Sequence, residues 1–155
     1  MVMRHDPIDP GQHYGVERPA FPERVGDRMR RPALTIGWDE PVARAARLMD
    51  ERHIRHLPVV DVHRRLVGIV TDGDLREALA AEGVREASMA PATLIVGKTM
   101  TADVVAVTPS CPLADAVALM RDRKLSALPV VDHDEVVGIL TEHDILRAFA
   151  ETMRG

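Results

Sequence analysis

Two segments of this 155-residue chain place a threonine three residues before an aspartate, where an apolar run is expected to turn into a helix. The first holds Thr71 and Asp74, and the second holds Thr141 and Asp144. A helix start offers unpaired N–H groups and a positive dipole end, which suit a phosphate. The hydroxyl can donate to a phosphate oxygen, and the carboxylate can accept both hydroxyls of a ribose. The same spacing also forms a capping box without any ligand.

Basic residues distinguish the two segments from each other. Arg55 and His56 stand just before a Leu-Pro-Val-Val-Asp motif that precedes the first segment, whereas Ser126 and Ala127 stand before the same motif ahead of the second. Arginine makes bidentate, charge-assisted bonds to phosphate that serine and alanine cannot make. Arg55 and His56 are thus suited to contact a phosphorylated ligand. The alternative for Arg55 and His56 is a solvated basic pair at the entrance of a strand.

Both segments belong to an internal repeat. Residues 57–61 return as 128–132 with the same sequence, Leu-Pro-Val-Val-Asp, at an offset of 71. The offset falls to 70 for residues 67–69 and 137–139, as a one-residue deletion in a loop explains. Such tandem units cannot bury a core alone. We expect two copies packed face to face with pseudo-two-fold symmetry.

Hydrophobic patterning predicts the order β-α-β-β-α in each copy, a mixed α/β (α+β) fold. The first strands are predicted at 33–36 and 104–107, with Pro41 and Pro112 at the first position of the following helices. Four aliphatic runs are predicted as strands buried on both faces: 57–60, 66–70, 128–131 and 136–140. The apolar faces of the helices are predicted from residues at helical spacing: Val42, Ala45, Ala46, Met49, Leu75, Ala78, Leu79, Leu113, Ala116, Val117, Met120, Ile145, Ala148 and Phe149. The predicted organisation is an extended arm over 1–24, repeats over 25–80 and 96–155, and a linker over 81–95.

Composition narrows the possible functions. Twenty basic and 24 acidic residues give a net charge of −4, which argues against a nucleic-acid partner. No apolar run reaches the length of a membrane span, and the N-terminus lacks a signal-peptide pattern. The only cysteine, Cys111, has no suggested catalytic partners, and the seven histidines lack metal-ligand spacing. We expect a cytoplasmic protein without a metal site.

The repeated motifs resemble the CBS domain, which occurs in tandem pairs called Bateman modules. The resemblance covers residues 25–80 and 96–150, where both copies carry the Leu-Pro-Val-Val-Asp motif and the Thr-x-x-Asp motif in order. More narrowly, 52–61 and 138–149 look like the CBS pair of acetoin-utilisation accessory proteins, many of which carry a further ligand-binding domain.

This resemblance implies an adenosine-containing regulatory ligand, either AMP, ADP, ATP or S-adenosylmethionine, and no obligatory cofactor. It assigns the phosphate to the threonines, the ribose to the aspartates, and further phosphate contacts to Arg55 and His56. The resemblance therefore implies that the first site prefers a phosphorylated ligand, and that the second binds a less charged adenosyl compound or nothing. The adenine is expected in an apolar slot between the copies, lined by four residues: Thr35, Ile36, Ala106 and Val107.

The resulting hypothesis is a regulatory, energy-sensing module that passes a ligand-induced change to a partner protein. The alternative is a ligand-independent scaffold for dimerisation or docking, since CBS pairs commonly form disk-like homodimers; a homodimer is expected in either case. An enzyme is not expected, because the CBS-bearing inosine monophosphate dehydrogenase places its chemistry on a (β/α)8 barrel of about 250 residues.

Overall fold

The computed structural model describes residues 23–155, which form two compact units. The first unit is residues 34–104, and the second combines 23–33 with 105–155. The mixed α/β fold with two repeats agrees with the prediction. The predicted arm over 1–24 lies outside the described residues except for its last two positions, Glu23 and Arg24.

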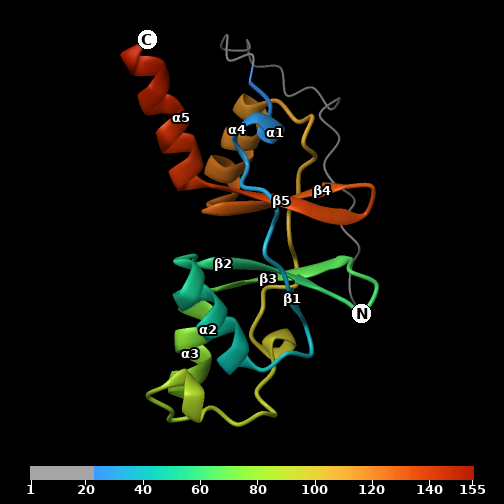
Figure 1. Cartoon of the computed structure of the whole chain (residues 1–155), viewed down its shortest axis with the longest axis vertical. Helices are drawn as coiled ribbons and strands as arrows, with labels where there is room; N and C mark the ends of the chain where they lie inside the picture. The colour runs from blue at the N-terminus through green and yellow to red at the C-terminus, as the bar shows by residue number, and fades with distance from the viewer. Residues whose placement is uncertain (1–22) are drawn as a thin grey trace. The chain divides into compact units, whose positions relative to one another are not determined.

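The first unit is a three-stranded sheet with two helices on one face (Figure 1). Its elements are β1 (Ile36–Gly37), α2 (Val42–Arg52), β2 (His56–Val60), β3 (Leu66–Thr71), α3 (Asp72–Ala81), and the 3-10 helices η1 (Ala87–Met89) and η2 (Val96–Lys98). Strand β2 lies in the middle, parallel to β1 and antiparallel to β3. This pairing brings the end of β3, where α3 begins, beside the start of β2.

The second unit has a two-stranded antiparallel sheet. Its elements are α1 (Val25–Arg28), α4 (Leu113–Arg123), β4 (Ala127–Asp132), β5 (Glu135–Thr141) and α5 (Glu142–Arg154). The register of β4 against β5 repeats that of β2 against β3: Ala127 faces Thr141, as His56 faces Thr71. The helix-start positions of the two repeats are therefore built in the same way.

The prediction of the first strands was only partly correct. In the first repeat the strand is Ile36–Gly37, later than predicted. In the second repeat the predicted strand at 104–107 is wrong, because Val107 makes only an isolated parallel bridge to Val130. Helices α2 and α4 also begin one residue later than predicted, so that Pro41 and Pro112 are N-cap residues and not the first helical residues.

The four later strands lie where they were predicted, but burial on both faces holds for only two of them. All residues of β2 except the first are buried, and so are all of β4 except the last. Strands β3 and β5 alternate between buried and half-buried residues toward their ends. A glycine at the middle of each, Gly68 or Gly138, is the place where another segment approaches closely.

Each unit is completed by the leading segment of the other repeat. Val25, at the start of the first repeat, donates its N–H to the carbonyl of Cys111 at 2.8 Å and is fully buried in the second unit. Val96, at the start of the second repeat, donates to the carbonyl of Glu40 at 2.9 Å and is fully buried in the first. These exchanges add apolar residues that a single repeat lacks.

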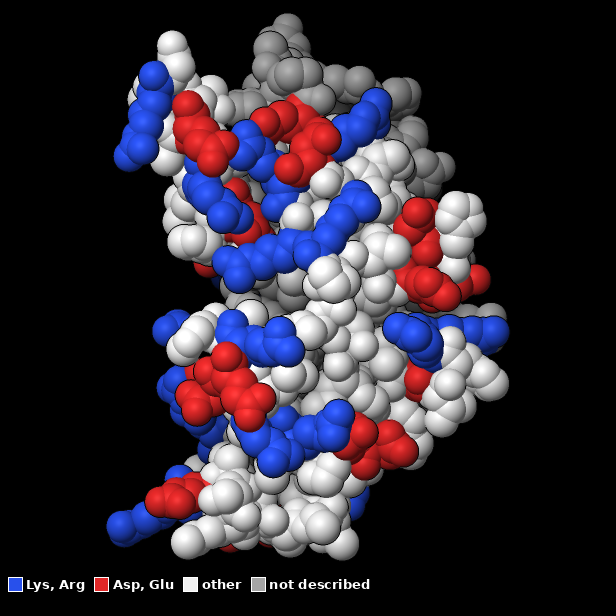
Figure 2. Space-filling model, viewed as in Figure 1, with Lys and Arg blue, Asp and Glu red and all other residues white. Residues whose placement is uncertain are grey.

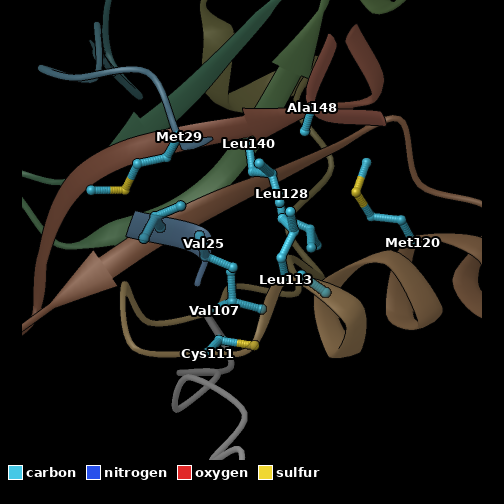
Figure 3. Close-up of a cluster of buried hydrophobic side chains, with 11 residues drawn as sticks. Val25, Met29, Val107, Cys111, Leu113, Met120, Leu128, Leu140 and Ala148 are labelled. Carbon is cyan, nitrogen blue, oxygen red and sulfur yellow. The ribbon is translucent and has the colours of Figure 1, made fainter. Parts of the chain in front are cut away.

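Aliphatic side chains fill the two cores, one in each unit. In the second unit Leu128 and Leu140, from β4 and β5, are fully buried against residues of α1 and α4 (Figure 3). Two residues predicted on buried helix faces are exposed instead: Val117 of α4 at 37% and Phe149 of α5 at 56%. The apolar surface of α5 therefore extends beyond the face that the core covers.

Candidate functional site

The threonine and aspartate of the first unit form a capping box at the start of α3. The N–H of Thr71 donates to Oδ2 of Asp74 at 2.9 Å, and the N–H of Asp74 donates to Oγ1 of Thr71 at 3.1 Å. The ligand-free interpretation of this motif is therefore realised. Capping uses only one oxygen of the carboxylate, and no residue between 23 and 155 donates a hydrogen bond to the other, Oδ1.

The hydroxyl of Thr71 is also only half used. Its oxygen accepts the Asp74 N–H, while its own hydrogen has no acceptor among the described residues. Both residues are half-buried. The junction of β3 and α3 thus presents a hydroxyl donor and a carboxylate acceptor at the positive end of a helix dipole. Two N–H groups of this helix start are already bonded, that of Asp72 to the carbonyl of Arg55 and that of Asp74 to Thr71.

The second unit builds the same box but leaves neither side-chain group open. Asp144 accepts at Oδ2 from both the N–H and the hydroxyl of Thr141, each at 2.9 Å. At Oδ1 it accepts from Nη2 of Arg147 at 2.9 Å and from Nε of Arg30 at 3.3 Å. The carboxylate is 1% exposed. The two sites are therefore different in hydrogen bonding although their backbones match.

The structure places Arg55 and His56 directly beside the first helix start. The N–H of Asp72, the first residue of α3, donates to the carbonyl of Arg55 at 3.0 Å, and His56 lies opposite Thr71 in the sheet. Arg55 is exposed, and its guanidinium has no hydrogen-bond or ion-pair partner within residues 23–155. The backbone of a residue with a free cationic side chain thus lies next to an anion-attracting helix end.

Ser126 and Ala127 occupy the corresponding place in the second unit. The N–H of Glu142, the first residue of α5, donates to the carbonyl of Ser126 at 3.0 Å, and Ala127 lies opposite Thr141. The structural equivalence assumed from the repeat is therefore real. Neither side chain can supply a positive charge to a phosphate.

The four residues expected around an adenine are Thr35, Ile36, Ala106 and Val107. They differ in burial, since Thr35 is half-buried and the other three are buried. Ile36 pairs with Val59 and is buried in the first core, and the half-buried Thr35 precedes it at the outer strand of the sheet that carries Thr71. In the second unit Ala106 and Val107 are 2% and 1% exposed, and Val107 belongs to the core. The side chains of Ile36 and Val107 thus pack in the cores, as apolar strand residues usually do.

Arg30 and Arg147 are contacts that sequence reasoning missed. Arg30 lies 114 residues from Asp144, so no local pattern connects them. The only available signal was a mismatch between the repeats, since Thr101 and Glu77 stand where the second site has the two arginines.

Catalysis by a cysteine and binding of a metal ion find little support within residues 23–155. Burial raises the pKa of the Cys111 thiol to about 11, and the charge of Asp115 acts in the same direction. A thiol with such a pKa is a poor nucleophile at neutral pH. No group of three or more possible metal ligands occurs within residues 23–155.

Charges of both signs are interspersed over each unit on the face drawn in Figure 2. No extended basic surface of the kind that binds nucleic acid is seen on that face. Among residues 23–155 the helices are all too short or too polar to cross a bilayer.

Known structures resemble this chain over most of its length. The CBS pair of protein MJ0100, in complex with 5′-methylthioadenosine and S-adenosylmethionine, is 32% identical with a TM-score of 0.73; the match covers 83% of this chain and 97% of that one. CBSX2 in complex with AMP is also 32% identical, with a TM-score of 0.71, covering 84% and 98%. AcuB from Vibrio cholerae, described as an acetoin utilisation protein, is 30% identical with a TM-score of 0.72, covering 84% and 93%.

Curated relatives are much longer than the matched region. The chain covers 24% of a homoserine O-acetyltransferase from Methanohalobium evestigatum, to which it is 34% identical over 128 residues, or 82% of its own length. It spans a similar fraction, about a quarter, of the other curated relatives it matches. The family model of the CBS domain matches residues 25–81 and 96–151. With both repeats matched, and with likeness to a solved CBS pair over 83% of its length, the chain belongs to the CBS domain family.

Proposed function

We propose that this chain is a regulatory CBS pair that binds an adenosine-containing ligand at the Thr71–Asp74 site and signals its presence to a partner protein. The observation that carries the proposal is the open oxygen Oδ1 of Asp74, at a helix start whose first N–H donates to the carbonyl of Arg55. A ribose needs an acceptor for its hydroxyls, and a phosphate needs donors and positive charge. The first site offers an open acceptor at Asp74, a free hydroxyl donor at Thr71 and a cationic residue, Arg55.

The structural relatives support this choice of ligand. One solved CBS pair holds 5′-methylthioadenosine and S-adenosylmethionine, and another holds AMP. All three compounds contain adenosine, while only AMP carries a phosphate. Since Arg55 supplies a positive charge at the first site, AMP or a related nucleotide is the ligand we propose for this chain.

Changing Asp74 to asparagine should remove the thermal stabilisation by AMP. A ligand at about 100 times its Kd adds about 2.7 kcal/mol to the free energy of unfolding, which raises Tm by roughly 5–10 °C for a chain of this size. Asparagine retains an oxygen that can accept the capping N–H of Thr71, but it replaces the second acceptor by an NH2 group. The measurement is a thermal-shift series with AMP, ADP, ATP and S-adenosylmethionine.

Asp144→Asn is the matched control, because it alters the same capping box in the other unit. We expect this variant to melt at a lower temperature but to keep its shift with AMP. Absence of any shift in the wild type with all four compounds would refute adenosyl binding. A shift that survives in Asp74→Asn would mean that the ligand binds elsewhere.

One observation favours the scaffold as a second candidate. Leu146, Phe149 and Met153 are 66%, 56% and 71% exposed along α5, at spacings of three and four residues that place them on one face. Val117 and Leu125 line an adjoining groove between α4 and α5, with a volume of about 490 Å³. An exposed apolar strip of this kind is typical of a protein-binding surface, and we propose that a second copy of this chain covers it.

The double change Leu146→Glu and Phe149→Glu tests the dimer. Charges on the strip should convert a dimer into a monomer in sedimentation-velocity experiments, without changing the Tm shift with AMP. The double change Val62→Glu and Met89→Glu, at two exposed apolar residues of the first unit, provides the control. A wild-type protein that sediments as a monomer at high micromolar concentration would exclude the homodimer.

A further inference from the structure

The two arginines on Asp144 set the second site apart from the first. Arg147 follows Asp144 by one helical turn in α5, and Arg30 comes from the segment after α1, at the start of the first repeat. Their side chains are 52% and 46% exposed, whereas the carboxylate between them is 1% exposed. Together with Thr141 they account for every hydrogen bond that the carboxylate accepts from residues 23–155. No acceptor site on Asp144 is left pointing to solvent.

The first unit contains the equivalent positions without the arginines. Arg30 forms a backbone bridge to Ile139, and Thr101 forms the corresponding bridge to Ile69, so Thr101 stands in the place of Arg30. Glu77 is the third residue after Asp74, as Arg147 is the third after Asp144. A glutamate and a threonine cannot supply two charged donors to a carboxylate. The open oxygen of Asp74 follows from these two replacements.

We propose that Arg30 and Arg147 are specificity-determining residues that close the second site to adenosyl ligands and restrict binding to the first. This inference rests on the proposed function, because it names which of two similar sites is used. A ribose at Asp144 would have to displace two charge-assisted bonds and replace them by bonds from neutral hydroxyls, which are weaker. It would also leave a buried carboxylate without its positive partners, which is strongly unfavourable.

The closure has a consequence for the chain's architecture. Arg30 belongs to the first repeat in sequence but acts in the second unit, because the segment 23–33 packs there. The backbone bridge holds it in place, with the Arg30 N–H donating to the carbonyl of Ile139 at 2.9 Å. The segment thus both completes the second core and supplies one of the two groups that close its site.

Exchanging the equivalent residues between the repeats tests this directly by isothermal titration with AMP. The wild type should bind one AMP per chain, and the double variant Arg30→Thr, Arg147→Glu should bind two, the second more weakly. The reciprocal variant, Thr101→Arg with Glu77→Arg, should weaken AMP binding at the first site at least tenfold. Two equivalent AMP sites in the wild type would overturn the inference, and so would a double variant that is folded by circular dichroism and still binds one.

Arg147→Ala alone is a milder test, since alanine favours a helix at this half-exposed position. It should give a detectable second AMP site, or at least a more reactive Asp144. Carboxyl reactivity is measured with a water-soluble carbodiimide and an amine, followed by peptide mass spectrometry. Asp74 should be modified faster than Asp144 in the wild type, and the two rates should converge in Arg30→Thr, Arg147→Glu.

The two measurements separate the failure of the inference from the failure of the proposed function. If the wild type binds no AMP while Asp144 is selectively protected, the proposed ligand is wrong and the closure of the Asp144 carboxylate stands. If the wild type binds AMP through Asp74 but Asp144 is as reactive as Asp74, the function stands and the closure is wrong. Equal reactivity together with two AMP sites rejects the closure on both readouts.

Discussion

Replacing Arg55 and His56 by serine and alanine, the residues of the second repeat, should weaken AMP binding about 10- to 100-fold and leave adenosine binding nearly unchanged. A hydrogen bond to a charged group contributes about 1.5–3 kcal/mol, and each 1.4 kcal/mol corresponds to roughly tenfold in Kd. The guanidinium of Arg55 has no partner among residues 23–155, so its loss should not disturb the fold. Titration calorimetry with AMP and adenosine measures both affinities.

The ratio of the two affinities is the decisive quantity, because only AMP carries the phosphate. Arg85→Ser is the control: Arg85 follows the other end of α3, so the variant loses the same charge from the same unit away from the helix start. It should keep the wild-type ratio. Equal losses of AMP and adenosine affinity in the Arg55 and His56 variant would indicate damage to the site as a whole. An unchanged AMP affinity would remove Arg55 from the site.

Repetition made most of the fold predictable from the sequence. The recurrence of residues 57–61 at 128–132 located β2 and β4, and both helix starts followed from the threonine–aspartate spacing. The resemblance to the CBS domain associated Arg55 with the first helix start, and the carbonyl of Arg55 lies there. These features are local in sequence, or are repeated locally, so a comparison of the two copies was sufficient to find them.

Features that depend on distant segments were not predictable. Val25 and Val96 each complete the core of the unit that carries the other repeat, and neither lies in a periodic pattern. Val107 reads as a strand residue by composition but makes only one bridge. The exposure of Phe149 shows the same limit, because apolar spacing marks a helix face without indicating what covers it.

The chemistry of the site was likewise predictable where it depends on neighbouring residues and unpredictable where it depends on distant ones. The types and spacing of Thr71 and Asp74 were sufficient to propose ribose and phosphate contacts, and the capping box confirms the alternative role that the same spacing suggested. The two sites differ in whether Oδ1 of the aspartate already accepts hydrogen bonds: in Asp144 it does, and in Asp74 it does not. That depends on Arg30, more than a hundred residues away from Asp144 in sequence, and required three-dimensional contacts.

The change Gly138→Ala should destabilise the second unit, and Gly68→Ala should destabilise the first to a similar degree. A Cβ on Gly138 would lie 2.9 Å from the carbonyl oxygen of Arg30 and 2.6 Å from the sulfur of Met29. On Gly68 it would lie 2.9 Å from the carbonyl oxygen of Thr101 and 2.5 Å from the sulfur of Met100. The methionines can move, but the carbonyls are held by backbone bridges to the neighbouring strand residues, Ile139 and Ile69.

Overpacking of this kind costs about 1–3 kcal/mol, which lowers Tm by roughly 3–10 °C for a chain of this length. Thermal unfolding followed by circular dichroism measures the effect, and Gly73→Ala is the control. Gly73 lies in the first turn of α3, where the nearest atom to an added Cβ is Oγ1 of Thr71 at 3.7 Å. Alanine should be neutral or slightly stabilising there, because it favours helix more than glycine does. If Gly138→Ala and Gly68→Ala have the same Tm as the wild type, the segments that carry Arg30 and Thr101 approach β5 and β3 less closely than the structure shows. Arg30 would then not be held firmly enough to keep Asp144 closed.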